Sequence, residues 1–279
     1  MNKKIAALTT GAVLLFVFVA FFIYRTITKI APAERAMPAA AVTGTDDKEA
    51  LFAKAGRIES QGSIFKARQM YGGIIENFPD WKEIPKVQEA LEDANVKLLF
   101  SSVETPDSIA YEVQKGDTLS GLAKRFNTTV ELIMKANGLK TPSIRIGKKL
   151  KISKAKFSII VDKSQNILTL KSGQDIIKTY KVSTGKNSCT PVGAFTITNK
   201  LVDPPWYPDS GGVIPYGDPR NVLGSRWMGI SMKGYGIHGT TDPGAIGESV
   251  TDGCVRLNDS DVEELYAIVP VGTQVEIVD

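Results

Sequence analysis

The stretches GIHG at residues 236–239 and TDGCVR at residues 251–256 decide how the C-terminal half of this chain is interpreted. They contain His238, the single histidine of the 279 residues, and Cys254, one of only two cysteines. A thiol needs a base to become a good nucleophile near neutral pH, and imidazole is the usual one. Since the chain has no second histidine, the sequence predicts His238 as base and Cys254 as nucleophile.

The residues around these stretches predict a sheet-built domain. Short runs rich in Val, Ile, Thr and aromatic residues alternate with turn residues, as is typical of strands. The expected strands are residues 157–161, 167–170, 176–182, 194–198 and 273–278. A helix is expected at residues 260–268, and the Pro- and Gly-rich residues 204–219 are expected to form a long loop over a binding cleft. The acidic residues of this region are interpreted as turn and cap residues, namely Asp242, Asp259 and Asp261.

Four motifs in order, at residues 182–186, 190–195, 237–239 and 251–256, resemble the YkuD-type L,D-transpeptidase catalytic domain over about residues 155–279. The resemblance implies cleavage of the bond between the third residue of a peptidoglycan tetrapeptide stem and its terminal D-alanine. The acyl group then passes to a side-chain amine of another stem, giving a 3→3 cross-link. No cofactor is expected, and no His/Cys cluster has zinc-ligand spacing.

The resemblance assigns catalytic roles by position. Cys254 corresponds to the nucleophile and His238 to its base, and the main-chain carbonyl of Gly239 corresponds to the group that orients the imidazole. An imidazolium beside the thiol would stabilise its thiolate, which attacks an amide carbonyl to form a thioester.

A substrate-binding set is expected around the nucleophile. Arg256 offers a rigid fork for a carboxylate, and Gly253 is expected to leave room for a substrate carbonyl near the main-chain N–H of the nucleophile. Thr251 and Asp252 complete the set. Related sequences often have histidine where Asp252 stands, so its carboxylate either raises the pKa of the thiol or holds an incoming amine.

Cys189, the second cysteine, precedes Thr190 and Pro191. A lone cysteine is usually an inert packing residue, and Cys189 is interpreted as one. A disulfide between Cys189 and Cys254 would block the nucleophile and is not expected.

Residues 111–152 predict a strand, two helices and a second strand. Thr118 is the expected N-cap of the first helix, and Gly138 marks the end of the second. The string resembles a LysM module, which implies a βααβ unit at residues 108–154 that binds N-acetylglucosamine-containing glycans such as peptidoglycan. The alternative is a module that only spaces domains.

Residues 46–105 predict helices with apolar faces, and they resemble a single tetratricopeptide-type helix pair followed by a third helix. A spacer and a protein-binding module remain equal alternatives for this segment.

The N-terminal residues predict a membrane anchor. Residues 5–24 carry no charge, and an apolar run of about 20 residues matches the hydrocarbon core of a bilayer. We expect an anchor at residues 1–29, a linker at 30–45 and the catalytic domain on the extracytoplasmic, periplasmic side. A cleaved signal peptide is the alternative.

The sequence thus predicts a multidomain envelope enzyme that acts on peptidoglycan stem peptides. The chain has a net charge of +4, and its excess of basic charge lies in the leader and in residues 111–153, so no nucleic-acid tract is expected. Two alternatives keep the acyl-enzyme but change the acceptor: an L,D-carboxypeptidase that uses water, and an enzyme that attaches protein to peptidoglycan. A non-catalytic wall-binding adaptor is the alternative of another class.

Overall fold

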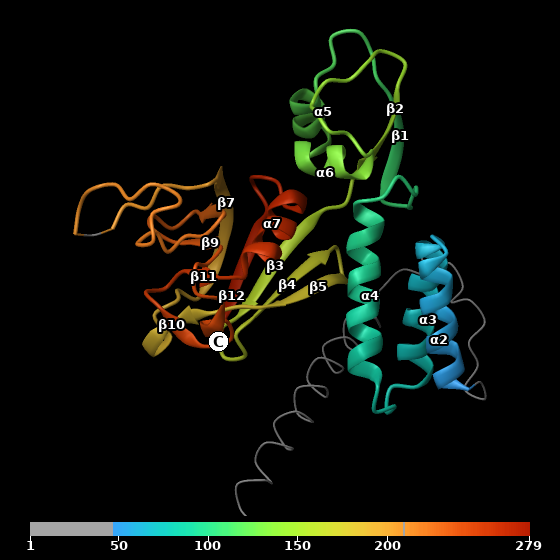
Figure 1. The fold of residues 1–279 in the computed structure, drawn as a ribbon, viewed down its shortest axis with the longest axis horizontal. Helices are drawn as coiled ribbons and strands as arrows, with labels where there is room; N and C mark the ends of the chain where they lie inside the picture. Colours follow the sequence, from blue (N-terminus) through green and yellow to red (C-terminus); the bar gives the residue numbers. More distant parts are fainter. Residues whose placement is uncertain (1–46, 209) are drawn as a thin grey trace, which may run out of the picture. The chain divides into compact units, whose positions relative to one another are not determined.

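A computed structural model describes residues 47–208 and 210–279 (Figure 1). The described residues divide into two compact units, with the boundary between Ala94 and Asn95. The predicted anchor at residues 1–29 and linker at 30–45 lie outside the described residues. Within the part that is described, no helix is both long and apolar enough to cross a membrane.

The first unit is helical, as the sequence predicts for this region. Its helices are α2 (Lys48–Ser60), α3 (Ile64–Asn77) and α4 (Ile84–Leu99), the last of which continues into the second unit. Asp47 caps α2 by accepting hydrogen bonds from the N–H groups of Glu49 and Ala50. The apolar faces meet around Phe52, whose ring lies edge-on to Tyr71 at 5.9 Å and to Trp81 at 6.2 Å between centroids.

The LysM-like region has the predicted order of elements. These are β1 (Ser108–Glu112), α5 (Leu119–Phe126), α6 (Val130–Ala136) and β2 (Lys149–Ser153), with β1 antiparallel to β2. Thr118 caps α5, as predicted, because its hydroxyl accepts the N–H of Gly121 at 3.1 Å. Gly138 follows α6 with φ of +60°, a conformation that favours glycine at a helix end. Leu122, Ile133 and Leu150 fill the small core.

The rest of the second unit is built on one mixed sheet, ordered β11-β9-β8-β7-β12-β3-β4-β5. The strands are β3 (Phe157–Asp162), β4 (Ile167–Ser172), β5 (Asp175–Lys181), β7 (Gly193–Val202), β8 (Arg226–Ile230), β9 (Gly236–His238), β11 (Val255–Arg256) and β12 (Gln274–Val278). A further short pair joins β6 (Thr184–Gly185) to β10 (Ser249–Thr251) in parallel, and two 3₁₀ turns cover Lys186–Ser188 and Pro243–Ala245. Helix α7 (Asp259–Ile268) packs against β8 and β9 (Figure 1).

All five predicted strands form, and the predicted helix begins one residue earlier, at Asp259. The strands of this region that the sequence did not predict are β6, β8, β9, β10 and β11, which are short or interrupted by glycine and therefore lack a clear alternating pattern. The interpretation of Asp259 as a cap is wrong, because Asn258 occupies the N-cap position and the Asp259 carboxylate bonds to two other loops.

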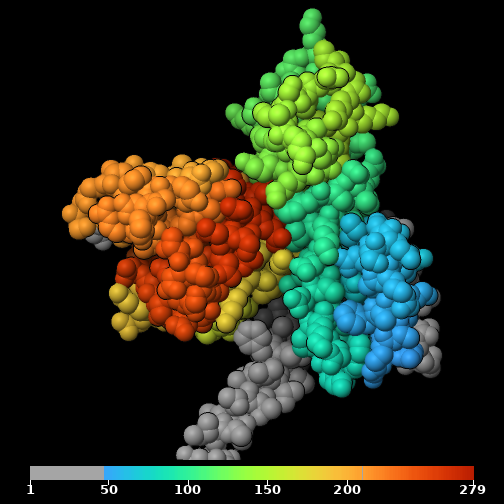
Figure 2. All heavy atoms as spheres, in the orientation of Figure 1, coloured from blue at the N-terminus to red at the C-terminus, as the bar shows by residue number. Residues whose placement is uncertain are grey.

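Residues 203–225 connect β7 to β8 as a long loop, as predicted for 204–219. Trp206 and Ile214 exchange two main-chain hydrogen bonds of 2.8 Å, which close part of the loop into a ribbon. Asn221 is buried and donates to the carbonyls of Pro204 and Ile214. Tyr207 and Val213 are more than half exposed on this segment, which forms the orange lobe of the C-terminal unit (Figure 2). Its function as a cleft cover stays a prediction.

Candidate active site

The register of two short parallel strands positions the site. Val255 of β11 lies opposite Ile237 of β9, and Arg256 lies opposite His238. Val255 and Ile237 point into the core, where they are 2% and 1% exposed. Because side chains alternate along a strand, Cys254, Arg256 and His238 project from the other face.

The imidazole of His238 is held in one tautomer. Its Nδ1 lies 2.7 Å from the carbonyl oxygen of Gly239, which is the next residue in the chain. A carbonyl only accepts hydrogen bonds, so Nδ1 carries the proton and Nε2 has a free lone pair. The ring of Trp227 stacks on the imidazole, with 5.8 Å between centroids and 23° between planes. The hydrogen bond and the stacked indole therefore fix the ring with Nε2 unprotonated.

The imidazole is neutral near pH 7. The pKa of His238 is lowered to about 4, mainly by burial and to a smaller extent by the nearby Arg256 cation. The carbonyls of Gly239 and Leu223 and the carboxylate of Asp259 oppose this shift, because each stabilises the protonated ring. Burial prevails, so the resting imidazole is ready to accept a proton.

The thiol of Cys254 is also protonated at rest, because burial raises its pKa above the ordinary range for cysteine. The N–H of Gly236 and the charge of Arg256 lower that pKa, whereas Asp252 adds a smaller increase. Thiol and imidazole therefore form a neutral pair at rest. Both shifts oppose a charged thiolate–imidazolium pair before substrate binds, and the roles of Cys254 as nucleophile and His238 as base stay predictions.

The side chain of Thr251 closes the turn that precedes Cys254. The Thr251 hydroxyl donates to the carbonyl of Cys254 at 2.7 Å and accepts the N–H of Gly253 at 3.2 Å. Gly253 has φ of +118°, and a Cβ there would lie 2.6 Å from the ring of Tyr235. Glycine is thus required by the backbone and by Tyr235. Its role in leaving room for a substrate carbonyl stays a prediction.

Two charged residues of the predicted substrate set lie beside this turn. Asp252 is exposed and pairs with Lys186 at 2.7 Å, which lowers the pKa of the Asp252 carboxyl. Arg256 exchanges main-chain hydrogen bonds with Ser183, and its side-chain Nε is buried with no hydrogen-bond partner among the described residues. A substrate carboxylate would supply an acceptor for such a donor. The substrate roles of Asp252, Arg256 and Thr251 stay predictions.

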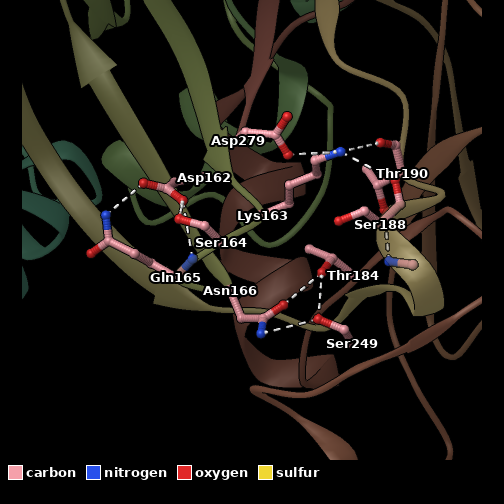
Figure 3. Close-up of polar contacts among 11 residues, drawn as sticks. Asp162, Lys163, Ser164, Gln165, Asn166, Thr184, Ser188, Thr190, Ser249 and Asp279 are labelled. Carbon is pink, nitrogen blue, oxygen red and sulfur yellow. Dashed lines mark hydrogen bonds and ion pairs between the residues drawn. The ribbon is translucent and has the colours of Figure 1, made fainter. Parts of the chain in front are cut away.

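The buried Lys163 side chain reaches the loop that carries Ser188 and Thr190 (Figure 3). The Nζ of Lys163 donates to the carbonyls of Ser188 and Thr190 at 3.1 and 3.2 Å and pairs with Asp279 at 3.0 Å. The Thr190 hydroxyl in turn accepts the N–H of Gly185 at 2.7 Å. A Cβ on Gly185 would lie 3.0 Å from the Cα of Gly253, so this loop directly contacts the turn that carries the nucleophile.

Replacement of Lys163 by methionine tests this support. We expect Lys163→Met to lower the free energy of unfolding by about 1–3 kcal/mol, because the buried carbonyl of Thr190 and the part-buried carbonyl of Ser188 lose their donor. Urea denaturation of the variant measures the loss, and Lys156→Met at an exposed position is the matched control. An unchanged urea midpoint for Lys163→Met would show that the loop holds without the lysine.

Cys189 lies on this supporting loop, and both cysteines are free. Its interpretation as core packing is wrong, because the residue is exposed. Its Sγ lies 3.8 Å from the carbonyl oxygen of Thr251. A second thiol therefore sits near the nucleophile without being bonded to it.

Sequence reasoning missed several neighbours of the site. Trp227 and Tyr235 lie on or beside the unpredicted strands, and Lys186 comes from a segment remote in sequence. Asp259 follows Cys254 closely in the chain, but its contacts to the loops at Ser225 and Thr240 were not predicted. Gly224 and Gly239 both leave space for the carboxylate of Asp259. No sequence pattern links these two glycines to Asp259, so its contacts could not be predicted.

Comparison with known proteins now assigns a family. Residues 156–277 match the model of the L,D-transpeptidase catalytic domain named YkuD, and residues 111–153 match the LysM domain. The putative L,D-transpeptidase YkuD of Bacillus licheniformis is 34% identical over 177 residues, which cover 61% of this chain and 98% of that protein. The chain belongs to the YkuD family of L,D-transpeptidases.

Other relatives agree with this assignment. The putative L,D-transpeptidase YkuD of Bacillus subtilis is 33% identical over 61% of this chain and 98% of its own length. A solved L,D-transpeptidase from Mycobacterium smegmatis matches 48% of this chain and 65% of its own with 22% identity and a TM-score of 0.39, a likeness too low to add to the argument. Members of this L,D-transpeptidase family are cysteine-dependent acyltransferases, so the resemblance drawn from the four sequence motifs is confirmed.

Proposed function

We propose that this chain is a peptidoglycan L,D-transpeptidase that forms 3→3 cross-links through a thioester on Cys254. The observation that carries the proposal is the His238 imidazole, held by the Gly239 carbonyl on the strand beside the nucleophile. A thiol and an oriented neutral base on one sheet face are what acyl transfer by cysteine requires.

The chemistry follows from the resting protonation states. His238 Nε2 takes the thiol proton as Cys254 Sγ bonds to the carbonyl carbon of the donor stem's third residue. The tetrahedral intermediate collapses, the bond to D-alanine breaks, and the imidazolium returns its proton to the leaving amine. An acceptor amine then attacks the thioester and gives a proton to His238. The Cys254 sulfur leaves and recovers that proton.

The burial of both groups favours this sequence of proton transfers. A buried imidazole with its pKa near 4 is unprotonated when substrate arrives. A buried thiol with a raised pKa keeps its proton until the imidazole accepts it. The main-chain carbonyl replaces the carboxylate of other triads, because the ring needs an acceptor on Nδ1 to fix its tautomer.

The identity of the acceptor is tested with purified muropeptides. Full-length chain in mild detergent is incubated with disaccharide-tetrapeptides, and the products are separated and weighed by mass spectrometry. We expect free D-alanine and a 3→3 linked dimer in equimolar amounts. D-alanine with tripeptide alone would indicate the carboxypeptidase alternative, and release of no D-alanine would refute the enzymatic proposal.

We also propose that the LysM module and an N-terminal anchor bring the catalytic domain to the wall from the membrane. Tethering raises the local concentration of a polymeric substrate without tight intrinsic binding. Cell fractionation followed by N-terminal sequencing tests the anchor, and a soluble protein beginning near Val42 would overturn it. Pull-down of the full-length chain on purified sacculi, with competing N-acetylglucosamine oligomers, tests the module.

A further inference from the structure

The carboxylate of Asp259, the first residue of α7, reaches out of its helix to two loops that are distant in sequence. Its Oδ1 accepts the N–H of Thr240 at 3.0 Å and the N–H of Ser225 at 3.2 Å. An aspartate in the first helical turn ordinarily interacts with the N–H groups of its own helix. Here Asn258 is the N-cap, and the Asp259 side chain serves the loops instead.

One of these contacts lies on the peptide that orients the base. The Thr240 N–H and the Gly239 C=O belong to the same peptide unit, which is planar and conjugated. The carboxylate binds the N–H end of this unit, and the Nδ1–H of His238 binds the C=O end. Hydrogen bonds in such a chain polarise one another, so a negative charge at the N–H end makes the carbonyl a stronger acceptor.

The two loops are shaped around this carboxylate. A Cβ on Gly239 or on Gly224 would overlap with Asp259 Oδ1, and Gly224 also has φ of +64°. The carboxylate therefore occupies the space that any side chain at these two positions would need. The contact is an integral part of the site rather than an incidental surface interaction.

We propose that Asp259 is a positioning residue for acyl transfer. Its carboxylate acts on His238 through the Gly239–Thr240 peptide, without contacting the imidazole directly. The inference rests on the proposed function, because it assigns a role toward the base of that reaction. Asp259 does not touch the reacting atoms. It fixes the plane of the Gly239–Thr240 peptide, and it strengthens the hydrogen bond between the Gly239 carbonyl and the Nδ1–H of His238.

The charged groups that act on His238 oppose each other. Arg256 disfavours the imidazolium, and Asp259 favours it. The imidazolium forms transiently in each proton transfer, so removing the negative charge should make that step slower.

Asp259→Asn isolates the charge, because asparagine keeps an acceptor oxygen at the same reach. We expect acylation of Cys254 by a carbapenem to slow roughly tenfold, as for outer partners of other functional histidines. We also expect the titration midpoint of the His238 ring to fall. Proton NMR of the ring C2–H follows it without assignment problems, since the chain has one histidine. Asp261→Asn, with the same charge change on the same helix turn, should leave both readouts unchanged.

The proposal is overturned if Asp259→Asn is acylated at the wild-type rate and the titration midpoint of its His238 ring is unchanged. A wild-type chain that no carbapenem acylates would instead overturn the proposed function, so the two failures are distinguishable. If Asp259→Asn does not fold, the wild type still decides the question. Its Thr240 amide proton must then shift with the same midpoint as the His238 ring, and a Thr240 signal that ignores that titration refutes the relay.

Discussion

Cys254→Ala abolishes acylation by a carbapenem and the release of D-alanine from tetrapeptide stems. We expect a loss of at least about a thousandfold, because removing a covalent nucleophile leaves only the binding and oxyanion contributions. Intact-mass spectrometry is the measurement: the wild type gains one adduct per chain, and the variant gains none.

Cys189→Ala is the matched control. Cys189 is the only other thiol, and it lies on the loop that supports the nucleophile turn. We expect this variant to keep the single adduct, which then maps to the peptide containing Cys254. An undiminished adduct on Cys254→Ala, or its loss in Cys189→Ala alone, would contradict the assignment of the nucleophile.

His238→Gln changes both the rate and its dependence on pH. We expect acylation at pH 7 to fall by about 10²–10⁴, the usual contribution of a general base. Because burial raises the pKa of Cys254, the remaining rate should rise about tenfold per pH unit above neutrality, following spontaneous ionisation of the thiol. The wild-type rate should instead be flat from pH 6 to 8. A flat profile in His238→Gln as well would argue against His238 as the base.

The same substitution has an expected effect on stability. The pKa of His238 is about 4 in the folded chain against an ordinary 6.5, so between these values only the unfolded chain binds the proton. Wild-type stability therefore falls as pH drops from about 6.5 to about 4, by about 3 kcal/mol in total. Glutamine cannot bind that proton. The difference between wild-type and His238→Gln unfolding free energies, measured by urea denaturation, should shrink by this amount over that range, and a constant difference would contradict it.

The strands predicted from sequence were those with a clear alternation of apolar and polar residues. β3 and β4 have this pattern because one face of each packs into the core. β9 and β11 have three and two residues, too few for any period to be visible. They are strands through their pairing with neighbours distant in sequence, since β9 pairs with β8 and β11 pairs with β9. Residues that position the site, such as Trp227 and Tyr235, escaped prediction for the same reason.

The sequence by itself determined the family and predicted the chemistry: one histidine, a cysteine in a glycine-marked turn and the motifs around them point to Cys254 as nucleophile and His238 as base. Only the tertiary structure decided the state of that pair. Burial keeps both groups neutral at rest, and it depends on how the sheet, α7 and the supporting loop pack together. Asp259 reaches the peptide behind His238 for a related reason, since hydrogen bonds between residues distant in the chain have no signature in local sequence.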